Sequence, residues 1–139
     1  MQFNFRQYRG EGINHEDQTF IGRFKVAPVA KIQAFNYRYT ATLGDGNLVH
    51  EEAGLIGQNE NGQWILVSQM DELPCVVTHG LVNHSAQEWK FAYRGQGTMA
   101  GFNSELVFLF SGDEFKLVHR WDMGQPASDK SWCHLIPLD

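Results

Sequence analysis

The amino-acid sequence predicts an all-β protein, an antiparallel up-and-down β-barrel of about ten strands with little helix. Apolar and polar residues alternate along most of the chain, as they do in strands that bury one face. No helical pattern, with apolar residues three and four positions apart, is sustained over several turns. Turn-forming sequences interrupt the alternation at residues 44–47, 59–62, 71–74, 83–87, 97–101 and 111–114. Regular turns without crossover helices favour a meander, and closure into a barrel removes its exposed edges.

The segments between these turns are the predicted strands. They are expected near residues 3–12, 19–27, 32–43, 48–58, 63–70, 75–83, 88–96, 102–111, 114–123 and 131–138. A chain of 139 residues can bury most of its apolar surface in one core without a metal or a disulfide. We therefore expect one barrel domain that comprises residues 1–139.

The turn at residues 111–114 tests whether the alternation is consistent between neighbouring strands. The cross-strand pairs it predicts are Phe110 with Phe115, Phe108 with Leu117, Leu106 with His119, Ser104 with Trp121, Glu105 with Arg120, Val107 with Val118, and Leu109 with Lys116. This register places Phe108, His119 and Trp121 on an interior face and leaves Glu105 and Arg120 on a solvated exterior. The strand near 88–96 repeats the alternation, with interior side chains Trp89, Phe91 and Tyr93.

The stretch HEE at residues 50–52 follows a second predicted hairpin, which is centred on Asp45-Gly46. A two-residue turn there predicts the pairs Gly44 with Asn47, Leu43 with Leu48, Ala41 with His50, Tyr39 with Glu52, Tyr37 with Gly54, and Phe35 with Ile56. Because side chains alternate along a strand, His50 and Glu52 share the aromatic face, and Glu51 points to the opposite face near Arg38. The three residues therefore do not form one cluster.

A carboxylate such as Glu52 is costly on an interior face unless it has hydrogen-bonding partners. The candidate partners are Tyr37, Tyr39, His50 and Gln69. Two interpretations stay open. The network closes one end of the barrel as a structural plug, or it orients a small ligand inside an otherwise apolar cavity. Both interpretations predict that the hydrogen-bonding capacity of Glu52 is satisfied.

The sequence contains no recognisable metal or nucleophile motif. No three histidines occur at a ligand spacing, and HEE lacks the second histidine, four positions away on a helix, of a metalloprotease motif. A metal site assembled from separate strands stays open. There is no GxSxG elbow. His79 alternates with Cys75 and Val77, a spacing compatible with an inward side chain. Cys75 and Cys133 show no CxxC spacing, so we expect two reduced thiols, and a disulfide would require barrel closure to bring them together.

The charged side chains comprise 16 acidic and 11 basic groups, a formal net charge of -5 with neutral histidines. This balance argues against a nucleic-acid or anionic-membrane partner, because such a partner needs a basic stripe. The first residues contain no apolar run of signal-peptide length, and the chain has no stretch of about 18 apolar residues. We expect a soluble, cytoplasmic protein.

Three segments resemble the calycins, the small antiparallel barrels that include lipocalins, cytosolic fatty-acid-binding proteins and haem-binding nitrobindins. The segments are FNFRQYRGEG, FIGRFKVAPV and AFNYRYTATLGDGNLVHEEAGLIGQNENGQWILV. The third contains an HxExG stretch, at residues 50–54, that follows a strand hairpin as in nitrobindins. The chain is similar to a bacterial branch of these barrels. The resemblance to nitrobindins implies an alternative function, haem binding with His134 as the axial ligand.

We predict non-catalytic binding of a small, largely apolar molecule inside the barrel, with no catalytic residue, metal ligand or resident cofactor. The predicted aromatic wall comprises Phe35, Tyr37, Tyr39, Trp89, Phe91, Tyr93, Phe108 and Trp121. His50, Glu52 and His119, with Gln69 nearby, orient a polar end of the ligand. Two alternatives remain, the haem protein with His134 and a small isomerase- or hydrolase-type enzyme with Glu52 as base and His50 as its partner. The oligomeric state stays open, with a homodimer as one option.

Overall fold

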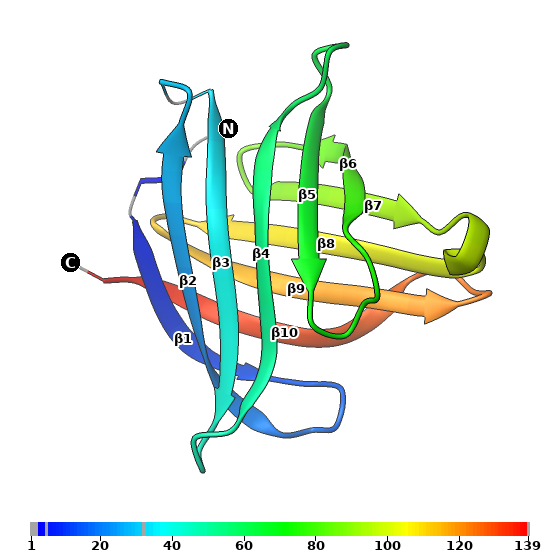
Figure 1. Cartoon of the computed structure of the whole chain (residues 1–139). Coiled ribbons are helices and arrows are strands. Elements are labelled where there is room, and N and C mark those ends of the chain that lie inside the picture. Colours follow the sequence, from blue (N-terminus) through cyan, green and yellow to red (C-terminus); the bar gives the residue numbers. More distant parts are fainter. Residues whose placement is uncertain (1–2, 5, 32, 139) are drawn as a thin grey trace.

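The residues described by the computed structural model, 3–4, 6–31 and 33–138, form ten antiparallel strands that close into a barrel (Figure 1). The strands are β1 (Gln7–Ile13), β2 (Thr19–Val29), β3 (Ala34–Leu43), β4 (Leu48–Gln58), β5 (Trp64–Met70), β6 (Val77–His84), β7 (Glu88–Arg94), β8 (Phe102–Ser111), β9 (Glu114–Met123) and β10 (Ser128–Pro137). Each strand pairs with its neighbours along the chain, and β1 also pairs with β10. The predicted all-β antiparallel barrel is therefore confirmed.

The bounds of β4, β8 and β9 are as predicted, whereas those of the other seven strands differ by one to four residues, for example at β1, β6 and β10. β1 begins at Gln7 rather than near residue 3, β6 at Val77 rather than near 75, and β10 at Ser128 rather than near 131. Five residues lie outside the described ones: 1, 2, 5, 32 and 139. The predicted domain includes all five, the predicted strand 3–12 includes residue 5, and the predicted strand 32–43 includes residue 32. In the described ranges the helical structure is the 3-10 turn η1 (Gly97–Met99), and no helix there is long and apolar enough to cross a membrane.

Aromatic side chains fill one end of the barrel interior. Phe3, which precedes β1, lies among Phe24, Phe35, Trp89 and Phe115, and its ring centroid is between 5.3 and 5.8 Å from theirs. Aromatic rings at such separations attract one another in addition to the gain from burial. This end of the barrel is therefore packed by the protein's own side chains.

The β8–β9 hairpin has the predicted register, with Phe110 opposite Phe115 at one end and an interior His119 further along. Its outer face is less solvated than predicted, because Val107 and Val118 are buried there. On the adjacent strand β10, Trp132 lies opposite Val118, and the Lys116 ammonium sits 4.7 Å from the centre of the Trp132 ring. Trp132 thus shields Val118 on the outer face. The alternation of apolar and polar residues along one strand does not show such shielding, because it comes from a side chain on a neighbouring strand.

The hairpin between β3 and β4 has a turn that differs from the predicted one. Leu43 pairs with Asn47 around a loop of residues 44–46, with a backbone N–O distance of 2.9 Å. Gly46 adopts a φ of +90°, in the left-handed region that glycine tolerates best. The predicted pairs of Leu43 with Leu48 and of Gly44 with Asn47 are therefore wrong.

A β-bulge in β4 compensates for that difference. Thr42 pairs with Leu48 and Ala41 pairs with His50, so Val49 is an extra residue in β4. One extra residue restores the predicted register from His50 onward. The predicted pairs of Ala41 with His50 and of Tyr39 with Glu52 are confirmed.

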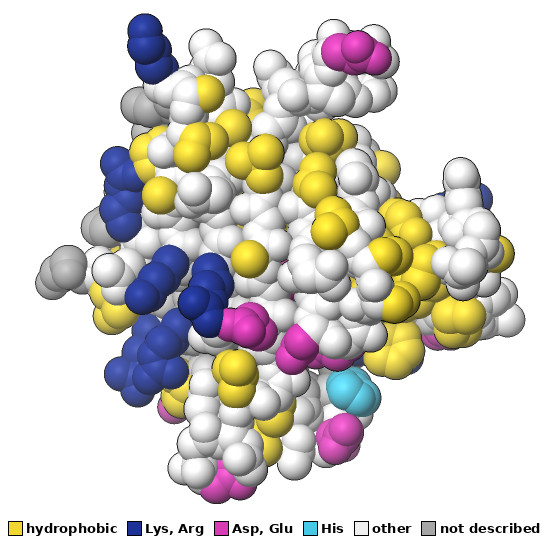
Figure 2. All heavy atoms as spheres, viewed as in Figure 1, with side chains coloured by type: hydrophobic (Ala, Val, Ile, Leu, Met, Phe, Trp, Pro, Cys, Tyr) yellow, Lys and Arg dark blue, Asp and Glu magenta, His cyan; other side chains and the backbone are white. Residues whose placement is uncertain are grey.

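Basic side chains gather on the outer face of β1–β3, at the left in Figure 2. Arg9 lies opposite Arg23, and Lys25 lies opposite Arg38. Arg38 pairs with Glu51, whereas no carboxylate among the described residues forms an ion pair with Arg9, Arg23 or Lys25. The negative net charge of the chain thus coexists with a basic face.

Gly54 allows the Tyr37 ring to lie across the backbone of β4. A Cβ at this position would lie 2.5 Å from the Val67 carbonyl oxygen and 2.7 Å from Cε1 of Tyr37. We expect Gly54→Ala to lower the free energy of unfolding by about 2 kcal/mol, because overpacking displaces a ring and a ladder oxygen. Urea denaturation measures the change. Gly80→Ala is the matched control, since a Cβ there meets nothing within 4 Å, and an equal loss in both variants would contradict the steric explanation.

Candidate functional site

The end of the barrel interior away from Phe3 contains a cavity of about 340 Å³. Its apolar lining comprises Phe20, Tyr39, Ala41, Val49, Met70, Leu73, Phe102, Trp121 and Met123. Its polar lining comprises Asn14, His15, His50, Glu72, Ser104, His119, Arg120, Lys130 and Ser131. Small-molecule sites in proteins occupy about 300 to 1,000 Å³, so this cavity fits a compact ligand rather than a long chain.

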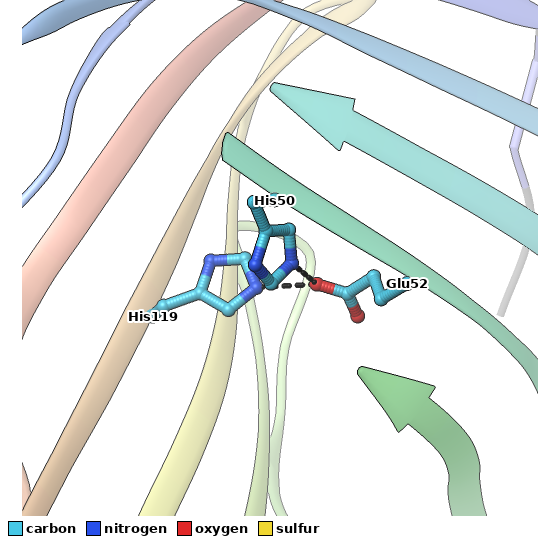
Figure 3. A group of neighbouring side chains, drawn as sticks. All are labelled: His50, Glu52 and His119. Atoms are coloured by element: carbon cyan, nitrogen blue, oxygen red, sulfur yellow. Dashed lines mark hydrogen bonds and ion pairs between the residues drawn. The ribbon is translucent and has the colours of Figure 1, made fainter. Parts of the chain in front are cut away.

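Two histidines beside the cavity converge on one buried carboxylate oxygen (Figure 3). Nε2 of His50, from β4, lies 2.8 Å from Oε1 of Glu52, and Nε2 of His119, from β9, lies 2.6 Å from the same oxygen. The Tyr37 hydroxyl donates a hydrogen bond of 2.6 Å to the other oxygen of Glu52. Glu52 is 1% exposed, and the predicted satisfaction of its hydrogen-bonding capacity is confirmed.

Hydrogen-bond geometry fixes the charge of His50. Its Nδ1 lies 2.6 Å from Oε1 of Glu72, while its Nε2 contacts Glu52. Ionised carboxylates only accept, so both ring nitrogens donate and His50 is an imidazolium cation. Burial alone would lower the pKa of His50, but its hydrogen bonds to Glu52 and Glu72 raise the pKa to about 10.

Glu52 is held in its ionised form by the same contacts. Burial would raise the pKa of Glu52, but the neighbouring His119 and His50 hold that pKa well below its usual value. Burial and the charge of Glu52 together raise the pKa of Tyr37, which therefore stays a donor. The Tyr39 ring stacks on His119, with centroids 5.6 Å apart and planes 19° apart. His50 and His119, both hydrogen-bonded to Glu52, thus form the polar floor of the cavity, and Tyr39 forms an aromatic side wall.

Four of the predicted site residues line this cavity: Tyr39, His50, His119 and Trp121. Tyr37 and Glu52 lie directly behind them and are bonded to the histidines or to each other. Trp121 is 37% exposed and therefore stands at the rim. His50, Glu52 and His119 thus form one cluster, in which His50 was a predicted partner of Glu52 and His119 was not.

The rest of the predicted aromatic wall does not contact the cavity. Phe35, Trp89, Phe91 and Phe108 are buried in the aromatic core. Tyr93 packs on His79, with ring centroids 5.6 Å apart, and does not line the cavity either. These five residues therefore do not line this cavity as predicted, and Phe35, Trp89 and Phe108 instead pack around Phe3 at the other end of the interior.

Gln69 lies on the outside of the barrel, so its predicted contact with Glu52 is wrong. Its side-chain amide donates to the carbonyl oxygen of Met70, the last residue of β5, and to that of Leu73 in the β5–β6 connection, each at 3.0 Å. The interior residues of β5 are the neighbours Ser68 and Met70. Met70, rather than Gln69, lies opposite Glu52 and lines the cavity.

His134 also faces outward and does not fit the role of an axial haem ligand inside the barrel. Its side chain is 52% exposed, and its Nε2 lies 2.8 Å from Oε2 of Glu114. The interior positions of β10 are Cys133 and Leu135, both fully buried. The implied haem ligation by His134 is therefore not supported by the position of its side chain.

Glu72 is the most important site residue that the sequence pattern did not indicate. It belongs to the predicted turn at 71–74 and reaches His50 from the loop between β5 and β6. Turn residues carry acidic side chains for solvation and for local hydrogen bonds, so DELP alone gives no sign of this contact. The contact between Glu72 and His50 is visible only in the structure, where the β5–β6 loop lies beside the first residues of β4.

The two cysteines differ in their expected reactivity. Both are free thiols, as predicted, with Cys75 exposed and Cys133 buried. Burial raises the pKa of the Cys133 thiol to about 11, and a thiolate is the reactive form. We expect a chromogenic disulfide reagent to modify one thiol per native chain rapidly and the second only on unfolding. Cys75→Ser should abolish the fast phase, and a fast phase that persists in this variant would contradict the burial of Cys133.

Comparison with known proteins places the fold but not the activity. The sequence matches no protein-family model, and no curated protein matches it. The structure is similar to the crystal structure of Rv2717c from M. tuberculosis, with a TM-score of 0.75 and 17% sequence identity, over 97% of this chain and 92% of that chain. At this identity the likeness shows a shared barrel fold and nothing about ligands.

Proposed function

We propose that this chain is a non-catalytic binding protein for a compact, largely apolar small molecule, and that its barrel is a calycin-like one. The observation that carries the proposal is the cavity of about 340 Å³, which joins apolar walls to a polar floor on one side. Small-molecule sites are typically apolar with a few fixed polar groups that orient the ligand. The proposed partner is thus a small molecule, and two free thiols support a cytoplasmic location.

The polar end of the ligand is oriented by the His119 edge of the cavity. Nε2 of His119 is committed to Glu52, whereas its Nδ1 has no hydrogen-bond partner among the described residues. Ser104 and Ser131 line the same cavity and offer hydroxyl groups. The apolar body of the ligand lies against Phe20, Met70 and other apolar walls.

General-base catalysis by Glu52 is not part of the proposal. Glu52 already accepts hydrogen bonds from His50, His119 and Tyr37, and its pKa is lowered, so it is a weak base. His50 carries a proton on both ring nitrogens and has no lone pair to offer as a partner base. The same network that binds and orients therefore opposes proton abstraction.

Native mass spectrometry of the protein purified from its natural cells tests the proposal directly. We expect a retained small mass, and saturable one-to-one binding of the uncharged fluorophore N-phenyl-1-naphthylamine after that mass is removed. Ala41→Leu fills the cavity and should weaken fluorophore binding by about 10-fold or more. Ala53→Leu makes the same change on the exposed face of β4 and should leave binding unchanged. Absence of both a retained mass and saturable binding, or equal binding by the two variants, would overturn the proposal.

A further inference from the structure

We propose that Nε2 of His50, Nε2 of His119 and Oε1 of Glu52 form a binding site for a divalent transition-metal ion, with Zn²⁺ as the simplest occupant. One ligand atom from each of these three residues lies within 4.8 Å of the other two. They come from β4 and β9, strands far apart in the sequence, and Figure 3 shows both rings pointing at one carboxylate oxygen. The site is additional to the proposed ligand binding and does not depend on it.

The donor set selects the class of metal. Two imidazole nitrogens and one carboxylate oxygen are ligands that Zn²⁺ and Fe²⁺ prefer. Mg²⁺ and Ca²⁺ prefer oxygen ligands alone and are disfavoured by the two imidazoles. In catalytic zinc sites, three protein ligands of this type leave a fourth position for water or an exogenous molecule.

The contacts behind the three donors match those behind metal ligands in proteins. Metal-binding histidines usually donate their second ring N–H to a carboxylate, and ligating carboxylates are themselves hydrogen-bonded. Nδ1 of His50 lies 2.6 Å from Oε1 of Glu72, and the Tyr37 hydroxyl donates to Oε2 of Glu52 at 2.6 Å. Neither contact involves the three proposed donor atoms, so these contacts are an independent observation that supports the site.

The fourth position is available on the cavity side. His50 and His119 both line the cavity of about 340 Å³, whereas Glu52 lies behind them. A metal ion bound between the three donors therefore has one side toward the cavity, where water or a small molecule can bind it. This arrangement has the open coordination of catalytic and ligand-exchanging metal sites rather than the closed one of structural sites.

Metal binding exchanges protons for the ion. In the metal-free protein both Nε2 atoms carry hydrogens that bond to Glu52, at 2.8 Å for His50 and 2.6 Å for His119. The metal takes the place of these two hydrogens. The Nε2 proton of His50 goes to solvent, and His50 keeps its N–H to Glu72. The Nε2 proton of His119 also goes to solvent, and exchange with solvent places a hydrogen on Nδ1 of the coordinating ring. Metal–ligand bonds of about 2.0 to 2.1 Å set tetrahedral donors roughly 3.3 Å apart, so each nitrogen–oxygen pair, now at 2.8 and 2.6 Å, must open by roughly 0.5 to 0.7 Å when the ion binds.

Titration of metal-free, untagged protein with Zn²⁺ alone, by calorimetry, tests the inference. Co²⁺ provides a second readout, because its visible absorption reports low-coordinate nitrogen and oxygen ligation. We expect one-to-one binding of both ions. His119→Gln should weaken binding by more than about 100-fold, and Tyr37→Phe and Glu72→Gln, which remove only outer contacts, by about 10-fold each. The two outer variants keep the test decisive if His119→Gln folds poorly.

Two control variants separate this site from others. His134→Ala removes an exposed histidine paired with Glu114 and should leave binding unchanged. Asp71→Asn removes a member of a second, more exposed group formed by His50, Asp71 and Glu72, and should also leave binding unchanged. The inference is overturned if the unmodified protein binds neither ion one-to-one. It is also overturned if either control variant, Asp71→Asn or His134→Ala, abolishes binding while Tyr37→Phe leaves binding unchanged. Because metal alone is the probe, failure here leaves fluorophore binding and the retained mass to be judged separately.

Discussion

Glu52→Gln is expected to lower the free energy of unfolding by about 3–5 kcal/mol, the range found when one partner of a buried charge pair is removed. The substitution keeps the size of the side chain but changes what its end can accept. Glutamine has one accepting oxygen in place of two, and its amide group would face an N–H or O–H donor. His50 would lose its hydrogen bond to the Glu52 carboxylate and keep the one to Glu72, with Asp71 3.8 Å from the same Nδ1. Tyr37 and His119 would compete for the single remaining acceptor.

Glu51→Gln is the matched control, because the same chemical change occurs one residue earlier on the opposite face of β4. Glu51 pairs with the exposed Arg38, and surface ion pairs contribute at most about 1 kcal/mol. Urea denaturation of both variants at neutral pH gives the comparison. Losses of similar size at the two positions would show that the interior network is not a stabilising feature and would remove the basis for a pre-organised polar floor.

The interior position of His50 and Glu52 was predictable from the sequence, although the turn that precedes them was not. The register difference at the loop of residues 44–46 and the bulge at Val49 have opposite effects, so the pairing beyond the bulge is the predicted one. A wrong register without compensation would leave Glu52 on the solvated face, where no cost of burial arises. The bulge restores this register because only this register places the aromatic side chains of the hairpin in the interior.

Gln69 shows where alternation carries no information. In β5, Trp64, Ile65, Leu66 and Val67 are all apolar, and the polar residues Ser68 and Gln69 are adjacent. Either face is then compatible with the sequence. The register with β4, in which Gly54 lies opposite Ser68, decides it, and that register depends on the loop before β5.

Which end of the barrel is packed and which is hollow could not be predicted either. Strand patterning assigns side chains to the interior without saying how far along the axis the interior is filled, since that depends on strand number and shear. Here Phe3, from outside the ladder, supplies much of the filling at one end. The interior faces of His50, Glu52 and His119 were predictable, because they follow from two hairpin registers. The contact between Glu52 on β4 and His119 on β9 depends on barrel closure, and Glu72 comes from a loop whose path no periodicity describes.

His79 is expected to make the protein less stable in acid by about 3 kcal/mol at most between pH 7 and pH 4. Burial lowers the pKa of His79 to about 4, with a partly opposing effect of Glu52 and a further lowering by His119. The unfolded chain has a histidine pKa of about 6.5. Between these two values the unfolded state binds a proton that the folded state does not, so stability falls as pH falls from about 6.5 to 4 and levels off below that. Each pH unit in this window corresponds to about 1.4 kcal/mol.

Comparison with His79→Gln isolates this contribution, because the two proteins share every other titrating group. The imidazole Nε2 lies 2.9 Å from Oγ of Ser104, and the glutamine amide can reach the same hydroxyl, while Nδ1 of His79 is buried without a partner among the described residues. We expect urea denaturation to show the variant as the less stable protein at pH 7 and the gap to close or reverse near pH 4.5. In the native protein, the NMR shifts of the His79 ring should stay at their neutral values down to about pH 5. A parallel fall in stability for both proteins, or a His79 ring that titrates near 6.5, would mean that solvent reaches this part of the interior and that the β6 and β8 walls open in the native state.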